Sequence, residues 1–534
     1  MVKKILRLTA LVLALCLLLT GCGMLDTLQK IASVYGLSAT SFEDMQYDRP
    51  DMEALEAALQ TCTELSQTAG DVDVLMDAVY DFYDLYDLYY TNYVLADIHY
   101  SCDITDDYWK AEYTFCAEAE PSAEAMLEQM LCDLADSPLR EDLEQEDFFG
   151  PGFFDDYEDE PVMNKKLVKL LEQEAALENR YYDLSDQHAS ADFTLNDEVY
   201  RQTAELYVDL IRIRQEISDY LGYPNYPELA YDMYYSRDYY PAEAERYMEQ
   251  IGQTLHDHYL QLQDSDIWEQ AYGYCKEAEA FRYVKKAAAA MGGTIEEAFQ
   301  LLERNDLYDI SYSSKKMDAS CETYIWNYYA PFVFVNPYLD HTDKLTFAHE
   351  FGHFAADYAC SGTYSGTDIA EVHSQTMEYL TLCYGQDTQM LTRYKLADSL
   401  CIYMEQSAFS LFEHRVYDLR GEDLTVENVE ELYRQTGIQF GFDTEGWNPR
   451  EYVTILHLYT DPLYMISYVV SNDLAMQFYQ MELEKPYSGL ELYESSLTSQ
   501  ESYILAFAED NGLQSPFDPG RPGALRELFT DIDF

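Results

Sequence analysis

Basic residues are scarce in this chain. Its 534 residues include 33 Lys and Arg against 99 Asp and Glu, which gives a formal net charge of -66. Binding to nucleic acid needs clustered Lys and Arg opposite the phosphates, so this class of function is excluded. The same negative field attracts cationic peptides or metal ions and repels an anionic membrane surface. Two interpretations of the charge stay open: solubility in a salty exterior, and steering of cationic substrates.

Other familiar patterns are also absent. No period of 20–50 residues repeats, which argues against a solenoid. The acidic segment 143–161 lacks an alternating D-x-D-x-D-G pattern, so we predict a solvated loop there and not a calcium site. The nine cysteines after Cys22 are odd in number and lack zinc-ribbon spacing, so no disulfide framework is expected. By contrast, 48% of the residues are hydrophobic and 51 are Tyr, which excludes overall disorder.

The N-terminus has the layout of a secretory signal. Three basic residues precede an apolar run over 8–19, and Leu19-Thr20-Gly21-Cys22 follows. This tetrapeptide resembles a bacterial lipobox, which implies that Cys22 becomes the lipidated first residue of the mature protein. The alternative is a signal anchor, for which the run is short. We expect a signal peptide over 1–21, a tether over 22–45, and a protein exported and lipid-anchored to the outer face of the cytoplasmic membrane, or periplasmic.

Helical periodicity dominates the remainder of the chain. Apolar residues recur at spacings of three and four from Met52 to Cys132. Further helices are predicted over 163–189, 196–221, 241–262, 268–291 and 294–303. The only strong β signals lie between Ile310 and Asn336, in IWNYYAPFVFVN, and helix resumes at Asp343. The expected organisation is a mostly α protein with an N-terminal helical region over 46–195 and a catalytic region over 196–534.

The segment FAHEFGHFAADY contains a candidate metal site. His349 and His353 are four residues apart, so they share one helix face and can chelate one metal, with Glu350 beside them. A chain with ten His and many Glu contains H-E-x-x-H by chance with a probability on the order of 1–2%. The motif therefore needs support from elsewhere in the sequence.

That support comes from DIAEVHSQTMEYL. Glu371 and Glu378 are seven residues apart, or two helical turns, so their carboxylates lie on one face. One carboxylate can coordinate the metal while the other orients a ligating histidine. His373 follows Glu371 by two positions, so we expect it to face away, at the surface.

Together, FAHEFGHFAADY and EVHSQTME resemble the metal-binding region of the thimet oligopeptidase and oligoendopeptidase F family of zinc metallopeptidases. The resemblance implies one Zn²⁺ per chain, held by His349, His353 and Glu371, with Glu378 supporting a ligand. It also implies that Glu350 is the general base. Glu371 follows His353 sooner than is usual in the family, so this sequence departs from the pattern in its linker.

A third stretch, ILHLYTDPLYMISY, resembles the family's C-terminal H-x-Y-x-x-P-x-Y-x-x-x-Y segment. Amide hydrolysis needs a donor aimed at the developing oxyanion, and His457, Tyr464 or Tyr468 can serve. The resemblance covers roughly Tyr200 to the C-terminus in specific motifs. It implies a mostly α fold with two helical lobes around a deep substrate channel and a small β-sheet beside the metal-binding helices.

The expected function is therefore zinc-dependent endopeptidase activity on short unfolded peptides. Two alternatives stay open: a peptide-binding lipoprotein that has lost turnover, and a zinc hydrolase of cell-wall peptides. The expected partners are a peptide substrate and the membrane, the latter only through a lipid on Cys22. No nucleic acid and no protein partner are expected.

Overall fold

The computed structural model describes residues 40–530 except 147, 158–161, 189–196, 263–264, 361, 363–365 and 443–447. The predicted signal peptide, Cys22 and most of the tether lie outside the described residues. The described part is mostly helical and contains a small three-stranded sheet, as the sequence predicted. No helix within it is long and apolar enough to cross a membrane.

The chain forms two compact units, each assembled from separated segments. The first comprises the described residues of 1–172, 297–336 and 354–364, and the second comprises those of 173–296, 337–353 and 365–534. Three helices pass from one unit into the other: α7 (Lys165–His188), α13 (Gly293–Arg304) and α14 (Asp343–Cys360). The boundary predicted at residue 195 and the predicted channel between lobes stay predictions.

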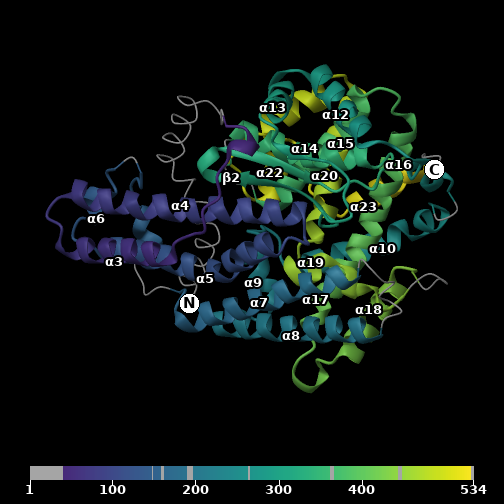
Figure 1. Cartoon of the computed structure of the whole chain (residues 1–534). Coiled ribbons are helices and arrows are strands. Elements are labelled where there is room, and N and C mark those ends of the chain that lie inside the picture. Colours follow the sequence, from purple (N-terminus) through teal and green to yellow (C-terminus); the bar gives the residue numbers. More distant parts are fainter. Residues whose placement is uncertain are drawn as a thin grey trace. The chain divides into compact units, whose positions relative to one another are not determined.

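Long amphipathic helices build the N-terminal part of the first unit. They are α3 (Met52–Thr68), α4 (Val72–Cys102) and α5 (Asp107–Ala135), with the short elements η1 (Phe42–Asp44), α6 (Arg140–Leu143) and η2 (Phe153–Tyr157). Figure 1 shows α3, α4 and α5 running side by side. An Asp side chain caps the N-terminus of each of the three, which satisfies backbone N–H groups that the helix leaves free. Tyr83, Tyr86 and Tyr89 of α4 pack into the core between them.

The sheet of the first unit has strand order β1-β3-β2. Its strands are β1 (Tyr308–Asp309), β2 (Ser320–Ile325) and β3 (Ala330–Val335). Strand β3 pairs parallel with β1 and antiparallel with β2. The 3₁₀ turn η3 (Trp326–Tyr328) links β2 to β3, ending at Tyr329 in the left-handed region. Every residue of β3 is buried, which explains its unbroken apolar run.

Within the described residues, the regular elements of the second unit are helices. Its elements are α8 (Asp197–Leu221), α9 (Tyr226–Met233), α10 (Pro241–Leu262), α11 (Ile267–Ala271), α12 (Glu277–Met291), α15 (Thr367–Tyr384), α16 (Gln389–Cys401), the π-helical turn η4 (Ile402–Gln406), α17 (Ser407–Val416), η5 (Gly421–Asp423), α18 (Val426–Gln439), η6 (Glu451–Thr454), α19 (Leu456–Thr460), α20 (Ile466–Glu484), α21 (Ser488–Ser496), α22 (Ile504–Asp510) and α23 (Arg521–Thr530).

The prediction of one helix over 268–291 was wrong, because the structure divides it into α11 and α12. The segment between them pairs with the chain that precedes α14 instead of continuing the helix. The N–H of Cys275 donates to the carbonyl of Leu339 at 2.9 Å, and Tyr274 forms a β-bridge with Asp340. Tertiary pairing therefore overrides the helical periodicity here.

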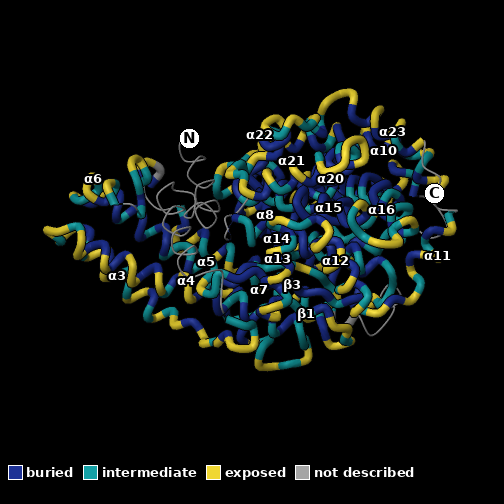
Figure 2. The backbone as a smooth tube through the Cα atoms, turned by 90° about the horizontal axis from the view of Figure 1, so that it is seen from above, coloured by how far each residue is buried: buried dark blue, intermediate teal, exposed yellow. Residues whose placement is uncertain are grey.

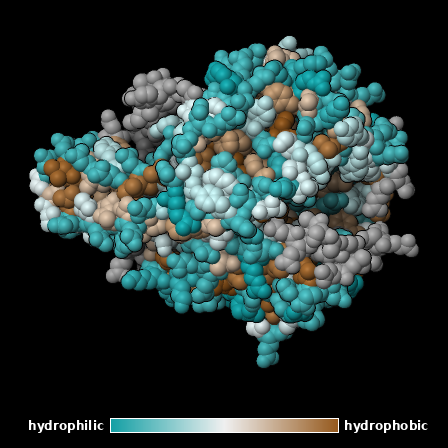
Figure 3. Space-filling view, in the orientation of Figure 1, coloured by the Kyte–Doolittle hydropathy of each residue, from teal (hydrophilic) through white to brown (hydrophobic). Residues whose placement is uncertain are grey.

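Helices α15 and α20 form the centre of the second unit. They pack against each other over most of their length, and Figure 2 shows them largely in dark blue. Both sequences mix apolar residues with small or polar ones on every face, as expected for helices that are covered all round. Hydrophilic residues cover most of the face seen in Figure 3, consistent with the excess of acidic side chains. All nine cysteines within the described residues are free.

Candidate active site

Gly352, inside the H-E-F-G-H sequence, lets α14 approach α15 very closely. A Cβ atom at this position would lie 2.6 Å from the Cα of Ser374 and 2.9 Å from the carbonyl oxygen of His373. Only glycine fits such a backbone contact without displacing the helices. The crossing brings the two histidines of α14 against Glu371 of α15.

The three predicted ligands meet at one point. Nε2 of His349 lies 3.3 Å from Oε2 of Glu371, and Nε2 of His353 lies 3.9 Å from its Oε1. One ligand atom from each residue falls within 4.8 Å of the others. Ligands placed 2.0–2.2 Å from a tetrahedral zinc lie about 3.3–3.6 Å apart. The donor set of two imidazoles and one carboxylate therefore fits a zinc ion, and the short linker before Glu371 does not prevent this geometry.

The charge states of two of these residues suit metal binding. Burial raises the pKa of Glu371, but His349, His353 and a hydrogen bond from Tyr464 together lower it to about 2, so this ligand is ionised. Burial lowers the pKa of His353 to about 4, so its imidazole is neutral near pH 7. An ionised carboxylate and a neutral imidazole are the forms that coordinate metals.

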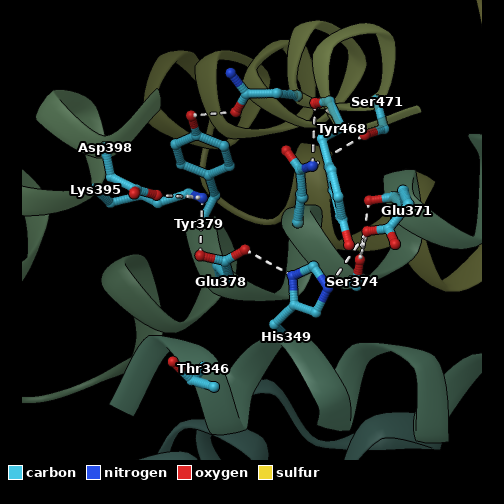
Figure 4. Close-up of polar contacts among 12 residues, drawn as sticks. Thr346, His349, Glu371, Ser374, Glu378, Tyr379, Lys395, Asp398, Tyr468 and Ser471 are labelled. Carbon is cyan, nitrogen blue, oxygen red and sulfur yellow. Dashed lines mark hydrogen bonds and ion pairs between the residues drawn. The ribbon is translucent and has the colours of Figure 1, made fainter. Parts of the chain in front are cut away.

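Glu378 lies on the opposite side of His349 from Glu371. Its Oε1 is 2.9 Å from Nδ1 of His349, so the two carboxylates of α15 flank one imidazole. Its other oxygen, Oε2, is 2.8 Å from Nζ of Lys395 on α16. Lys395 also approaches Oδ2 of Asp398 at 3.4 Å (Figure 4).

Glu350 opens onto a cavity of about 600 Å³. Burial is the main cause that raises the pKa of this carboxyl to about 7. The cavity is lined by Tyr272, Tyr338, Asp340, Thr342, Leu345, Thr346, His349, Glu350, Glu378, Tyr394, Asp398 and Tyr468. Of the three proposed ligands, His349 borders this cavity together with Glu350, so the cluster meets a space that accommodates a ligand at His349.

The segment from α19 to α20 contributes the three predicted oxyanion donors. Nε2 of His457 lies 3.1 Å from the hydroxyl of Tyr468, and its ring stacks on that of Tyr464 at 5.0 Å. The hydroxyl of Tyr464 donates to Oε1 of Glu371 at 2.5 Å. Tyr468 lines the cavity, so its hydroxyl and the metal-binding cluster face the same space.

Two buried arginines form hydrogen bonds with the segment from α19 to α20. Leu463 has a φ of 68°, a left-handed conformation unusual for a branched residue. The guanidinium of Arg237 holds the strained turn by donating to the carbonyl of Leu463 at 3.0 Å and to Oγ of Ser467 at 2.8 Å. Arg214 donates to the carbonyl of Leu458 at 2.8 Å. Both guanidinium groups are completely buried, so they act as structural ties.

Arg237 also ties this segment to the helix that carries Glu371. Its Nε lies 3.4 Å from Oδ1 of Asp368, at the start of α15. Asp368 in turn accepts hydrogen bonds from Tyr239 at 2.9 Å and from Ser467 at 2.5 Å. The position of Tyr464 is therefore fixed relative to the metal-binding cluster.

The structure corrects one expectation and adds residues that were not predicted. His373 is buried instead of exposed, because α15 is covered on all faces and this ring lies against Tyr493 and Phe507. The unpredicted residues that contact the site residues or support them are Lys395, Asp398, Arg214, Arg237 and Asp368. Nothing in their local sequence distinguishes them from solvated charges.

The N-terminal part of the chain matches a known family. Residues 42–160 match the profile of the Peptidase M3 N-terminal domain. This region showed only helical character in its sequence, so the match is independent of the metal-binding motifs. No curated protein matches the chain.

Solved structures share its fold over nearly the whole length. A protein described as an oligoendopeptidase F has a TM-score of 0.79 and 22% identity, with 93% of this chain and 99% of that chain covered. PZ peptidase A with an inhibitor has a TM-score of 0.77 and 21% identity, with 92% and 99% covered. A Bacillus anthracis protein, also described as an oligoendopeptidase F, has a TM-score of 0.76 and 21% identity, with 93% and 99% covered. The chain has the oligoendopeptidase F fold, and the comparisons support a peptidase.

Proposed function

We propose that this protein is a zinc-dependent endopeptidase that hydrolyses short unfolded peptides. The observation that carries the proposal is the convergence of His349, His353 and Glu371 beside Glu350 at one cavity. Three protein ligands with an open side are typical of catalytic zinc sites, whereas structural zinc sites are closed by four protein ligands. The match to a peptidase domain and the fold supply the reaction class.

The roles of the residues follow from their positions. His349, His353 and Glu371 would hold the ion, which would supply Lewis acidity that lowers the pKa of water and polarises a carbonyl. Glu350 accepts the proton of the attacking water and passes it to the leaving amine. The hydroxyl of Tyr468 or Tyr464, or the imidazole of His457, donates to the oxyanion that forms on the substrate carbonyl.

The substitution E350Q tests this assignment. It removes the base but keeps the three ligands, so turnover of a quenched peptide should fall by at least 10²-fold while one zinc per chain remains bound. The measurements are the peptide cleavage rate and the metal content of the purified chain. A chelator should abolish the parent's activity, and zinc should restore it.

The outcomes separate the alternative functions. Substantial turnover by E350Q would remove Glu350 from the mechanism. A parent that retains intact peptide without cleaving it, with or without metal, would be a binding protein instead. Cleavage of cell-wall peptides but not of a linear peptide library would favour the third function.

We further propose that the chain is exported and lipid-anchored through Cys22. The support is the basic and apolar N-terminal sequence that ends in Leu19-Thr20-Gly21-Cys22. These residues lie outside the described part of the chain, so the proposal rests on the sequence alone.

A further inference from the structure

A completely buried lysine lies directly behind the metal-binding cluster. Nζ of Lys395 lies 2.8 Å from Oε2 of Glu378, 3.4 Å from Oδ2 of Asp398 and 5.3 Å from the ring centroid of Tyr379. Its side chain is 1% exposed. Figure 4 shows the resulting row, from Lys395 through Glu378 to His349, which joins α16, α15 and α14.

Stability gives little reason for this arrangement. Burying an ammonium and a carboxylate costs several kcal/mol in lost hydration per ion, and apolar residues of similar size often replace such pairs without loss of stability. The other buried lysine among the described residues, Lys316, has a structural setting: its Nζ donates to the carbonyls of Val335 and Ser311 beside the sheet at 2.8 and 2.9 Å. Lys395 instead directs its charge at a residue that contacts a proposed metal ligand.

The hydrogen bonds between Lys395, Glu378 and His349 determine which nitrogen of His349 carries a hydrogen. An ammonium can only donate, so it occupies Oε2 of Glu378 and prevents that oxygen from turning toward the imidazole or the cavity. The other oxygen, Oε1, is left to accept from Nδ1 of His349 at 2.9 Å. With the hydrogen on Nδ1, the lone pair of Nε2 points to the side where Glu371 lies 3.3 Å away.

We propose that Lys395 is a positioning residue for the metal site. It fixes the carboxylate of Glu378, which in turn fixes the orientation and tautomer of His349. Lys395 touches neither substrate nor ion in this assignment and acts only through Glu378. The inference rests on the proposed function, because it requires that His349 binds a metal.

The test is the zinc affinity of the metal-stripped full-length chain, measured by competition with a chromophoric chelator. K395M keeps the length and apolar stem of the side chain but removes its charge. It should weaken zinc binding by about 10–100-fold, the usual effect of losing a group that supports a ligand. K316M is the matched control, since it also removes a buried lysine, and it should leave the affinity within about twofold of the parent.

A double-mutant cycle isolates the path through Glu378. E378Q alone should weaken zinc binding to a similar extent, and adding K395M to E378Q should cause no further loss beyond about twofold. This double variant removes both charges of the Lys395–Glu378 pair and leaves only Asp398, which lines the cavity, without its lysine, so it keeps the test valid even where K395M alone does not fold.

Each result is decisive. A folded K395M with parental zinc affinity would overturn the inference, as would an additional tenfold loss in the E378Q background. A parent chain that binds no zinc would overturn the proposed function itself, which distinguishes the two failures.

Discussion

At the residue scale, Tyr464 and Tyr468 differ in what their hydroxyls already contact. The hydroxyl of Tyr464 donates to the proposed ligand Glu371, whereas Tyr468 lines the cavity and its hydroxyl lies by His457. A donor that is committed to a metal ligand cannot also serve the oxyanion. The geometry thus favours Tyr468 among the three donors that the sequence left open.

The substitution Y468F should therefore lower kcat by about 10²–10³-fold, which is typical for loss of an oxyanion donor, while zinc affinity stays within twofold. Y464F should have the smaller effect on kcat and should weaken zinc binding, because Glu371 loses a hydrogen bond. The measurements are steady-state kinetics and zinc competition. Y459F is the control in the same segment, since it also removes a buried tyrosine hydroxyl, one that donates to the carbonyl of Thr203 and not to a site residue. If Y464F bound zinc as tightly as the parent and lost more kcat than Y468F, Tyr464 would be the oxyanion donor instead.

The site residues that could be predicted from the sequence are those that lie on the same helix as their neighbours in the site. His349, Glu350 and His353 share one helix, and so do Glu371 and Glu378, so helical geometry alone places each set. Lys395 and Arg237 could not be predicted, because their partners lie on other helices and the packing that joins them is not encoded in any short segment. His373 was misplaced because the pattern of α15 did not reveal that neighbours cover every face of this helix.

At the element scale, the close crossing of α14 and α15 makes Gly352 a sensitive position. In G352A the new methyl would meet the Cα of Ser374 at 2.6 Å and the Cβ of Met377 at 2.9 Å, neither of which can rotate away. The helices must separate, which moves Glu371 from the two histidines. We expect zinc affinity to fall at least tenfold and stability to fall by about 1–3 kcal/mol.

Thermal unfolding and zinc competition measure these two effects. Gly523 on α23 is a suitable control, because no atom lies within 4 Å of its Cβ position. G523A should be neutral or slightly stabilising, as alanine is favoured over glycine in helices. Parental zinc affinity in a folded G352A would show that the crossing tolerates separation.

Most helices could be predicted because their apolar periodicity and their Gly or Pro boundaries are local signals. The exception, the division between α11 and α12, depends on backbone pairing of Cys275 with Leu339, more than 60 residues later in the chain. The sheet contains one strand that could be predicted from the sequence and one that could not. The apolar run of β3 could be read from the sequence, whereas its parallel partner Tyr308–Asp309 has only two residues and lacks any alternation.

At the scale of the whole molecule, the net charge bears on the proposed attachment to a membrane. A net charge of -66 opposes adsorption to anionic lipids, so electrostatics cannot hold the chain there. The apolar run over 8–19 is also shorter than the roughly 20 residues needed to span a bilayer. The proposed covalent lipid on Cys22 would resolve this, since each buried CH₂ contributes about 0.8 kcal/mol and two chains give stable anchoring.

We therefore expect the chain expressed in a bacterial host with a lipoprotein pathway to incorporate an alkyne-labelled fatty acid and to lose residues 1–21. C22A should incorporate no label. C16A is the matched control, because Cys16 lies within the apolar run, and it should be labelled like the parent. In-gel fluorescence and mass spectrometry of the N-terminal peptide measure both effects. An unlabelled chain that keeps residues 1–21 and stays in the membrane fraction after a carbonate wash would identify the segment as a signal anchor, because charge repulsion leaves no other means of retention.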